Sequence, residues 1–157
     1  MSCATSTKNI ESITGFDSEK YLGKWYEIAR FDHSFERGLD YVSATYSIKP
    51  NGKIKVLNQG ILPNGENSTA EGKAYIKDSD NQLGELRVSF FLFFYAKYRI
   101  FYIDDDYQNA LVTSGTMNYL WILSRKPVLP QEELDYLLKI CQEKGFNTDK
   151  LIFPKQI

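Results

Sequence analysis

Turn signals at regular spacing are the feature of this sequence that most restricts its fold. They stand at Pro50-Asn51-Gly52, Pro63-Asn64-Gly65, Asp80-Asn81 and Asp104-Asp105-Asp106. The segments between them are short, and several alternate apolar with polar residues at a period of two, as in residues 42–48. Short alternating segments between regularly spaced turns predict an all-β protein, built as an antiparallel sandwich or barrel.

The later segments are apolar on both faces, in residues 99–103 and again in 119–123. A strand buried on both sides needs a cover on its outer face. The following sequence supplies one, because Pro130 and two glutamates suit the first turn of a helix. Its apolar stripe is Leu134, Leu137, Leu138 and Cys141, and Gly145 is a suitable end. We therefore expect one helix outside the late strands, followed by a short extended piece at residues 151–153.

Composition narrows the function classes. A chain of 157 residues suits one domain with a sizeable core. Its 19 basic and 20 acidic side chains nearly cancel, so no strong field would attract nucleic acid. The chain holds no run of about 18 apolar residues, the length that a membrane-spanning helix needs.

The two cysteines, Cys3 and Cys141, are too few for a disulfide framework, and with only His33 they make no zinc set. Cys141 is expected to be a small buried hydrophobe on the helix. Cys3 has two interpretations: an ordinary residue of a polar tail, or the lipidated first residue of a mature lipoprotein, with Met1 and Ser2 as additions. No apolar signal region is present to decide between them.

One face of the expected sheet gathers large aromatic side chains beside small ones; these residues are Tyr46, Phe90, Tyr102, Tyr119 and Trp121 with Ala44, Ala74 and Ala110. Such aromatics more often form a core than a binding site. The tyrosine hydroxyls and Asn58 nevertheless need polar partners, which a wet or ligand-filled cavity supplies. A solid core and a cavity therefore both remain open from the pattern alone.

Three separated motifs resemble those of the lipocalins: Gly23-x-Trp25, Asp105-Asp106-Tyr107, and Leu120 to Pro127 with Arg125 near its end. The second motif has aspartate where the family usually has threonine. Further segments, among them residues 28–33, 35–39 and 71–75, are similar to bacterial outer-membrane lipocalins, and residues 51–59 to apolipoprotein D. The similarity extends from Phe16 to Phe153.

The resemblance implies an all-β fold, an eight-stranded antiparallel up-and-down β-barrel with one C-terminal α-helix packed outside. Residues 1–15 would be an N-terminal tail holding the candidate lipid-anchor cysteine, and residues 16–157 one barrel domain. Trp25 would cross the closed end with Arg125 over its ring, a contact that contributes about 0.5–2 kcal/mol. Gly23, Asp106 and Tyr107 complete this structural motif.

The family also implies a small hydrophobic ligand, such as a long-chain fatty acid or a lysophospholipid, with no cofactor and no metal. Carried over by motif and strand parity, the inward residues are Ala44, Tyr46, Val56, Asn58, Ala74, Val88, Phe90, Ile100, Tyr102, Val112, Tyr119 and Trp121. At the mouth we expect Arg30, Phe31 and Phe35. Arg30 either faces solvent or meets an anionic head group, and His33 is expected to be a solvated loop residue.

Other functions remain as alternatives: a tetrapyrrole or other hydrophobic-cofactor carrier, an isomerase-type lipocalin, or an interaction module whose barrel is filled by its own side chains. Enzyme chemistry is disfavoured, because no Gly-x-Ser-x-Gly motif occurs and neither cysteine is expected on an inward strand. By resemblance the expected location is the periplasmic side of a bacterial outer membrane, with the membrane reached through lipid on Cys3. The chain is expected to be a monomer or a homodimer.

Overall fold

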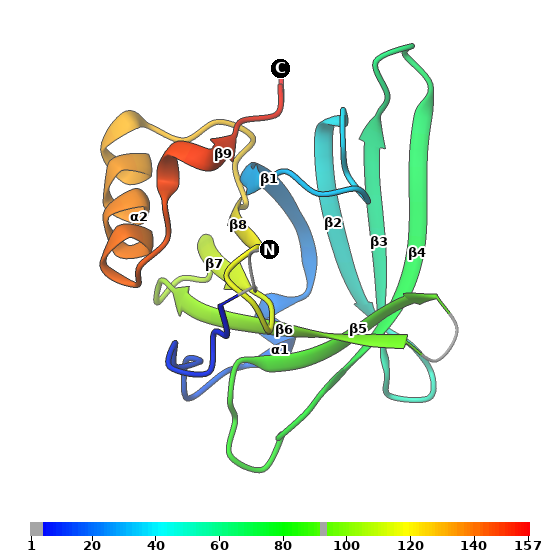
Figure 1. The fold of residues 1–157 in the computed structure, drawn as a ribbon. Coiled ribbons are helices and arrows are strands. Elements are labelled where there is room, and N and C mark those ends of the chain that lie inside the picture. The colour runs from blue at the N-terminus through cyan, green and yellow to red at the C-terminus, as the bar shows by residue number, and fades with distance from the viewer. Residues whose placement is uncertain (1–4, 92–93) are drawn as a thin grey trace.

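The computed structural model describes residues 5–91 and 94–157, so Cys3 lies outside the described residues. In chain order (Figure 1) the elements are α1 (Ser18–Tyr21), β1 (Gly23–Phe31), β2 (Asp40–Ile48), β3 (Ile54–Ile61), β4 (Asn67–Ile76), β5 (Glu85–Phe91), β6 (Phe94–Ile103), β7 (Asn109–Thr113), β8 (Leu120–Ser124), α2 (Gln131–Glu143), a 3₁₀ turn (Thr148–Lys150) and β9 (Leu151–Ile152). The fold is mostly strands, as the alternation predicted.

Each strand from β1 to β8 pairs antiparallel with the next, and β1 pairs with both β2 and β8, which closes the ring. The two-residue strand β9 adds to the outer part of β1. Within the described residues this is the predicted eight-stranded up-and-down barrel, with α2 lying outside it (Figure 1). The fold prediction is therefore confirmed.

Strand direction defines the two ends of the barrel. Loops 49–53, 77–84 and 104–108 lie at the same end as α1, which we call the closed end. Loops 32–39, 62–66 and 114–119 lie at the opposite end, which we call the mouth. Positions early in β1, β3 and β7 are therefore near the closed end, and late positions are near the mouth.

The closed end is sealed by Trp25 and Arg125. The Arg125 guanidinium lies 3.8 Å from the centroid of the Trp25 ring, and the indole is fully buried. The same guanidinium donates to the backbone carbonyls of Lys20, Leu22 and Tyr107, and also to that of Lys24. The contact predicted from the motifs is thus present, and it joins the start of β1 to the end of β8.

Gly23 and Tyr107 help to position the residues that seal the closed end. Gly23 has a φ of +98°, which favours glycine, and a Cβ there would come within 3.3 Å of the Arg125 guanidinium, so any side chain would make the guanidinium shift. The Tyr107 hydroxyl accepts a hydrogen bond from the backbone N–H of Asp17, the residue that caps α1. Asp106 is exposed, and its backbone carbonyl accepts from the Gln108 side chain within the turn.

Above the seal, three tyrosine hydroxyls form a chain inside the barrel. Tyr98 hydrogen-bonds to Tyr21 and, at 2.9 Å, to Tyr46. Burial raises the pKa of all three hydroxyls, to about 12 for Tyr46. Each polar tip therefore has a tyrosine partner, and this level of the interior is packed.

Helix α2 covers the outside of the late strands, as predicted. It follows Pro130, which occupies the N-cap position, and it buries Leu137 and Cys141 against the barrel wall. Leu111, Leu120 and Ile122 belong to the same buried cluster between helix and wall. No helix in the described part of the chain is long and apolar enough to cross a bilayer.

Two predicted site residues lie on this outer side, and both predictions of position were wrong. The pairing of β6 with β7 shifts between Ile100 and Tyr102, so one bulge sends both Phe101 and Tyr102 outward. Tyr102 meets Tyr136 of α2 at 6.1 Å between ring centroids. Phe31 follows the inward-facing Arg30, so its ring faces outward. There it is buried against Phe146, with 6.1 Å between the ring centroids.

The N-terminal segment from residue 5 onward is attached to the barrel. Ser6 forms a bridge with Thr116 in the loop between β7 and β8, and Thr7 is buried there. Farther along, the backbone N–H of Ile13 donates to Ile100 of β6. This part of the segment that was predicted to be a tail is therefore held against the barrel by hydrogen bonds.

Near the mouth, the seam between β1 and β2 is closed by the C-terminal segment. The ladder between these strands covers only Gly23–Tyr26 and Ser43–Tyr46. Beyond it, the Gln156 side-chain amide donates to the carbonyl of Glu27 on one strand and to that of Val42 on the other. One side chain thus bridges the two strands where their own hydrogen bonds end.

Candidate ligand-binding site

The predicted inward positions lie at two levels. Five of them are inside the barrel but packed in the closed-end core, each at most 5% exposed: Tyr46, Val56, Ala74, Ile100 and Val112. They form the floor beneath any ligand and leave little surface for one to touch.

The other inward positions keep exposed surface; they are Ala44, Asn58, Val88, Phe90, Tyr119 and Trp121. Ala44 pairs with Asn58, which in turn pairs with Ala70, so short side chains stand next to one another on three neighbouring strands. Across the barrel Tyr119 stacks on Trp121, with 5.8 Å between ring centroids. These six positions are therefore mainly apolar and remain partly accessible.

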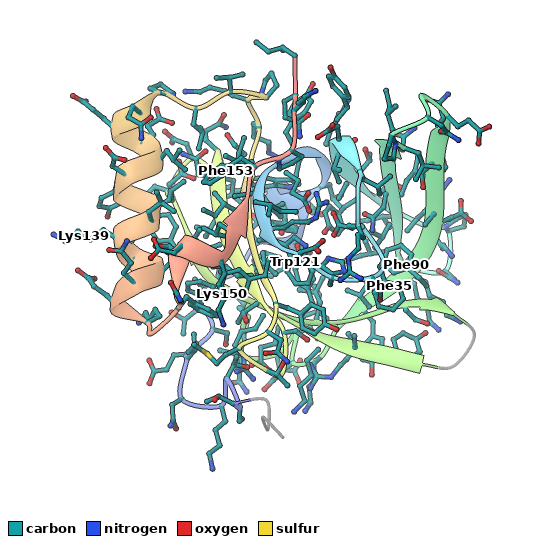
Figure 2. The ribbon with its side chains drawn as sticks, turned by 45° about the horizontal axis from the view of Figure 1, so that its top comes forward. Phe35, Phe90, Trp121, Lys139, Lys150 and Phe153 are labelled. Atoms are coloured by element: carbon teal, nitrogen blue, oxygen red, sulfur yellow. The ribbon has the colours of Figure 1, made fainter. Side chains whose placement is uncertain are left out.

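Phe90 lies flat against the wall, where Gly72 makes room for it. A Cβ at Gly72 would come within 2.7 Å of the Phe90 ring and 2.6 Å of the Ser89 carbonyl oxygen. The ring remains 42% exposed, and Phe35 of the first mouth loop is 82% exposed. Figure 2, which brings the top of the molecule forward, labels Phe35, Phe90 and Trp121.

A polar cluster stands beside this apolar wall, and a bulge in β1 creates it. The pairing of β1 with β8 shifts between Glu27 and Ala29, so Ile28 and Ala29 both pack outward. Glu27 and Arg30 consequently share the inner face, and they form an ion pair at 2.8 Å. Regular alternation would have put these two side chains on opposite faces.

The loop 32–39 completes the cluster. The Arg30 guanidinium donates to the backbone carbonyls of Glu36 at 2.7 Å and Leu39 at 3.3 Å. The Glu36 carboxylate accepts from the Trp121 indole at 3.0 Å, and the same oxygen is 3.0 Å from His33 Nε2. The Glu36 side chain is 14% exposed and that of Arg30 is 1% exposed, so the loop is folded into the mouth.

The two carboxyl groups of the cluster are shifted in opposite directions. Burial raises the pKa of Glu27 well above its ordinary value, and the neighbouring Glu36 raises it further. Burial also acts to raise the pKa of Glu36, but its interactions with the neighbouring Glu27 and His33 outweigh burial and lower that pKa to about 2. The surroundings therefore favour the charged form of Glu36 and disfavour that of Glu27.

Three buried polar atoms of the cluster have no hydrogen-bond partner among the described residues: Arg30 Nε, His33 Nδ1 and Glu36 Oε2. Arg30 Nε and Glu36 Oε2 face each other at 4.0 Å, beyond hydrogen-bond reach. Arg30 therefore does not face solvent, and the expectation of a solvated His33 was wrong. Both residues belong to one cluster in which some buried polar atoms lack hydrogen-bond partners.

Other candidate chemistry is not assembled in the described part of the chain. No group of three or more His, Cys, Asp or Glu side chains able to hold a metal ion occurs there. Asp104 accepts from the backbone of Gln108 and Asn109, which closes a turn. Cys141 lies outside the barrel wall, where burial raises its pKa to about 12.

Sequence reasoning missed Glu27, Glu36 and Tyr98 as interior residues. Glu27 could have been found, because it is two positions after the inward Trp25 and so has the same parity. Glu36 could not, since a loop has no periodicity to place its side chains. Tyr98 has the parity of Ile100, which was predicted inward, and that signal was available.

Comparison with known proteins agrees with this geometry. Residues 16–156 match the family model described as "Lipocalin-like domain". The outer membrane lipoprotein Blc of Citrobacter freundii is 46% identical over 156 residues, covering 99% of this chain and 88% of the relative. Apolipoprotein D of Cavia porcellus is 39% identical over 150 residues, covering 90% of this chain and 77% of the relative.

Among solved structures, insecticyanin from the tobacco hornworm superposes with a TM-score of 0.78 at 20% identity. That superposition covers 98% of this chain and 87% of insecticyanin. At such low identity it supports the fold alone.

Proposed function

This chain belongs to the lipocalin family, and we propose that it binds a long-chain fatty acid or lysophospholipid inside the upper barrel. It would store, scavenge or move such amphiphiles without changing them chemically. The observation that carries the proposal is the division of the interior: a packed floor below, and an accessible, mainly apolar wall above.

The wall favours a flexible acyl chain. Ala44, Ala70 and Gly72 leave space on one side, and Phe90, Tyr119 and Trp121 offer flat apolar faces on the other. Burying about ten methylenes contributes a gross ~8 kcal/mol at ~0.8 kcal/mol each. Ordering the ligand reduces this gain, so we expect a Kd in the micromolar range or somewhat tighter.

The polar cluster favours a head group at the same level. Arg30, His33 and the Trp121 indole N–H are donors beside the apolar wall, so an amphiphile can place its chain along the wall and its head on them. The chain would then extend toward the hydroxyls of Tyr46 and Tyr98, which limit its depth.

We propose an envelope location from the relatives, several of which are named outer membrane lipoprotein. Cys3 is the candidate residue for the lipid anchor. Mass spectrometry of the N-terminal peptide from native envelope would find acyl groups on Cys3, and an unmodified peptide in a membrane-free fraction would contradict the proposal.

A tetrapyrrole carrier is the second candidate, since His33 proves to be turned inward. Its Nε2 is engaged by Glu36, however, and only Nδ1 is without a partner, so the site suits an anionic head group better. An isomerase that uses a barrel cysteine is disfavoured, because Cys141 belongs to α2 and is buried between this helix and the outside of the barrel wall.

The test is direct. Lipid extracts of the purified protein are analysed by mass spectrometry, and fatty acids and lysophospholipids of several chain lengths are titrated against a fluorescent apolar probe. Probe displacement that strengthens with chain length supports the proposal. A preparation with a tetrapyrrole absorption band and no displacement by lipids would favour the second candidate, and absence of both would favour a filled barrel.

A further inference from the structure

Within loop 32–39, the side chain of Glu36 points into the polar cluster, next to that of His33. The neighbouring loop residues point the other way: Phe35 is 82% exposed, and Arg37 pairs with Asp32 on the surface. The loop is therefore held over the mouth by Glu36, His33 and two backbone carbonyls that accept from Arg30.

The donors around the Glu36 carboxylate form a recognisable set. Trp121 Nε1 donates to one oxygen at 3.0 Å, and His33 Nε2 is 3.0 Å from the same oxygen. Arg30 Nε points toward the second oxygen from 4.0 Å and bonds to none of the described residues. A guanidinium and an indole N–H directed at two oxygens of one carboxylate are the donors that a free carboxylate or phosphate would require.

Glu36 fills this set imperfectly. Its second oxygen and the Arg30 Nε–H are both buried and both lack a hydrogen bond among the described residues. A tethered carboxylate cannot approach closer without moving its backbone, whereas a free anion has no such restriction. The accessible wall at Tyr119 and Trp121 is continuous with these donors, so an acyl chain lying there would bring its own anion to them.

We propose that, in the ligand-free barrel, Glu36 occupies the place of the ligand's anionic head group. On this view, which rests on the proposed function, an amphiphile bearing a carboxylate or phosphate exchanges with Glu36 on Arg30 and Trp121. Loop 32–39 is released in the same step. A neutral head group exchanges less well, because it offers Arg30 and Trp121 no charged acceptor in place of the Glu36 carboxylate.

The decisive measurement compares matched ligands on matched variants. Removing one carboxylate of the cluster would let the other ionise beside Arg30, so the comparison is made in an E27Q background. Dodecanoate, lauroyl lysophosphatidate and dodecanol are titrated against E27Q and E27Q/E36Q. The control variant is E27Q/D32N, which removes an exposed carboxylate of the same loop.

We expect E27Q/E36Q to bind both anionic ligands about tenfold more tightly than E27Q, since a neutral amide competes less well than a carboxylate. Dodecanol should change by less than about twofold, and E27Q/D32N should match E27Q for every ligand. A gain for dodecanoate alone would identify a carboxylate site, and a gain for lysophosphatidate alone a phosphate site.

A second measurement uses the unaltered protein. The indole N–H signals of Trp25 and Trp121 are followed by NMR; Trp25 donates to the Tyr21 carbonyl in the closed end and serves as an internal reference. Dodecanoate should shift the Trp121 signal and leave that of Trp25 in place, and dodecanol should shift neither by a comparable amount.

Equal shifts with both ligands, or no affinity gain in E27Q/E36Q, would overturn the exchange while leaving lipid binding intact. If neither the acid nor the alcohol binds the unaltered protein, the proposed function itself fails.

Discussion

Replacing Arg125 by alanine tests how the barrel is held closed. The change removes a guanidinium 3.8 Å from the Trp25 ring and four hydrogen bonds to backbone carbonyls. The ring contact contributes about 1–2 kcal/mol where water is partly excluded. Hydrogen bonds to a charged group contribute about 1.5–3 kcal/mol each when buried, but several of these carbonyls can regain water. We therefore expect the free energy of unfolding to fall by about 3 kcal/mol.

Urea unfolding measures this loss. With a slope of about 2 kcal/mol per M, the midpoint should fall by about 1.5 M. Arg125→Lys should recover about half, because an ammonium keeps the charge over the ring but reaches fewer carbonyls. The control is Lys126→Ala, which breaks a surface pair with Glu133 at 3.3 Å and should cost less than about 0.5 kcal/mol.

Ligand affinity should stay within about twofold in Arg125→Ala, because the seal lies below the packed floor. A loss of binding at unchanged stability would refute this account of the closed end. So would a destabilisation no larger than that of Lys126→Ala.

Further predictions concern the floor, the wall and the outer face. Because the pKa values of Tyr21, Tyr46 and Tyr98 are raised, the folded state keeps protons that the unfolded state loses above pH 10. The free energy of unfolding is therefore unaffected by the ionisation of these tyrosines below pH 10 and falls as the pH rises toward 12. The slope of unfolding free energy should be up to ~1.4 kcal/mol per pH unit for each tyrosine and shallower in Tyr98→Phe, as measured by urea titrations at several pH values. Gly72→Val should push the Phe90 ring off the wall and weaken lipid binding at least about fivefold in the displacement titration, whereas Gly52→Ala, at an open turn, should leave binding unchanged. Tyr102→Ala should lower the unfolding free energy by about 1–2 kcal/mol without changing lipid affinity, whereas Trp121→Ala should weaken lipid binding. A loss of binding in Tyr102→Ala would contradict the outward placement of Tyr102.

The sequence was sufficient for features that depend on periodicity. Alternation in residues 42–48 and the helical spacing of Leu134, Leu137, Leu138 and Cys141 correspond to the observed β2 and α2. The contact of Trp25 with Arg125 followed from motifs, since two short segments far apart in the chain carry it.

Periodicity failed where a bulge adds a residue to a strand. One extra residue in β6 turned Tyr102 outward, and one in β1 brought Glu27 and Arg30 to the same face. A bulge is decided by pairing with the neighbouring strand, which the sequence of one strand does not reveal. Glu36 lay beyond prediction for a different reason, because its place depends on donors from β1 and β8 that meet only in the folded barrel.

The Gln156 bridge has a consequence for how wide the mouth can become. Below Glu27, enlarging the circumference between β1 and β2 would require breaking a backbone ladder. Above it, the contacts that the described residues make across the gap are the two hydrogen bonds from Gln156, those of Lys155 with Asp40 and Tyr41, and that of Arg30 with the Leu39 carbonyl. Binding of a ligand bulkier than a single hydrocarbon tail would therefore break these contacts and widen the mouth, while the barrel diameter at the level of Trp25 stays constant.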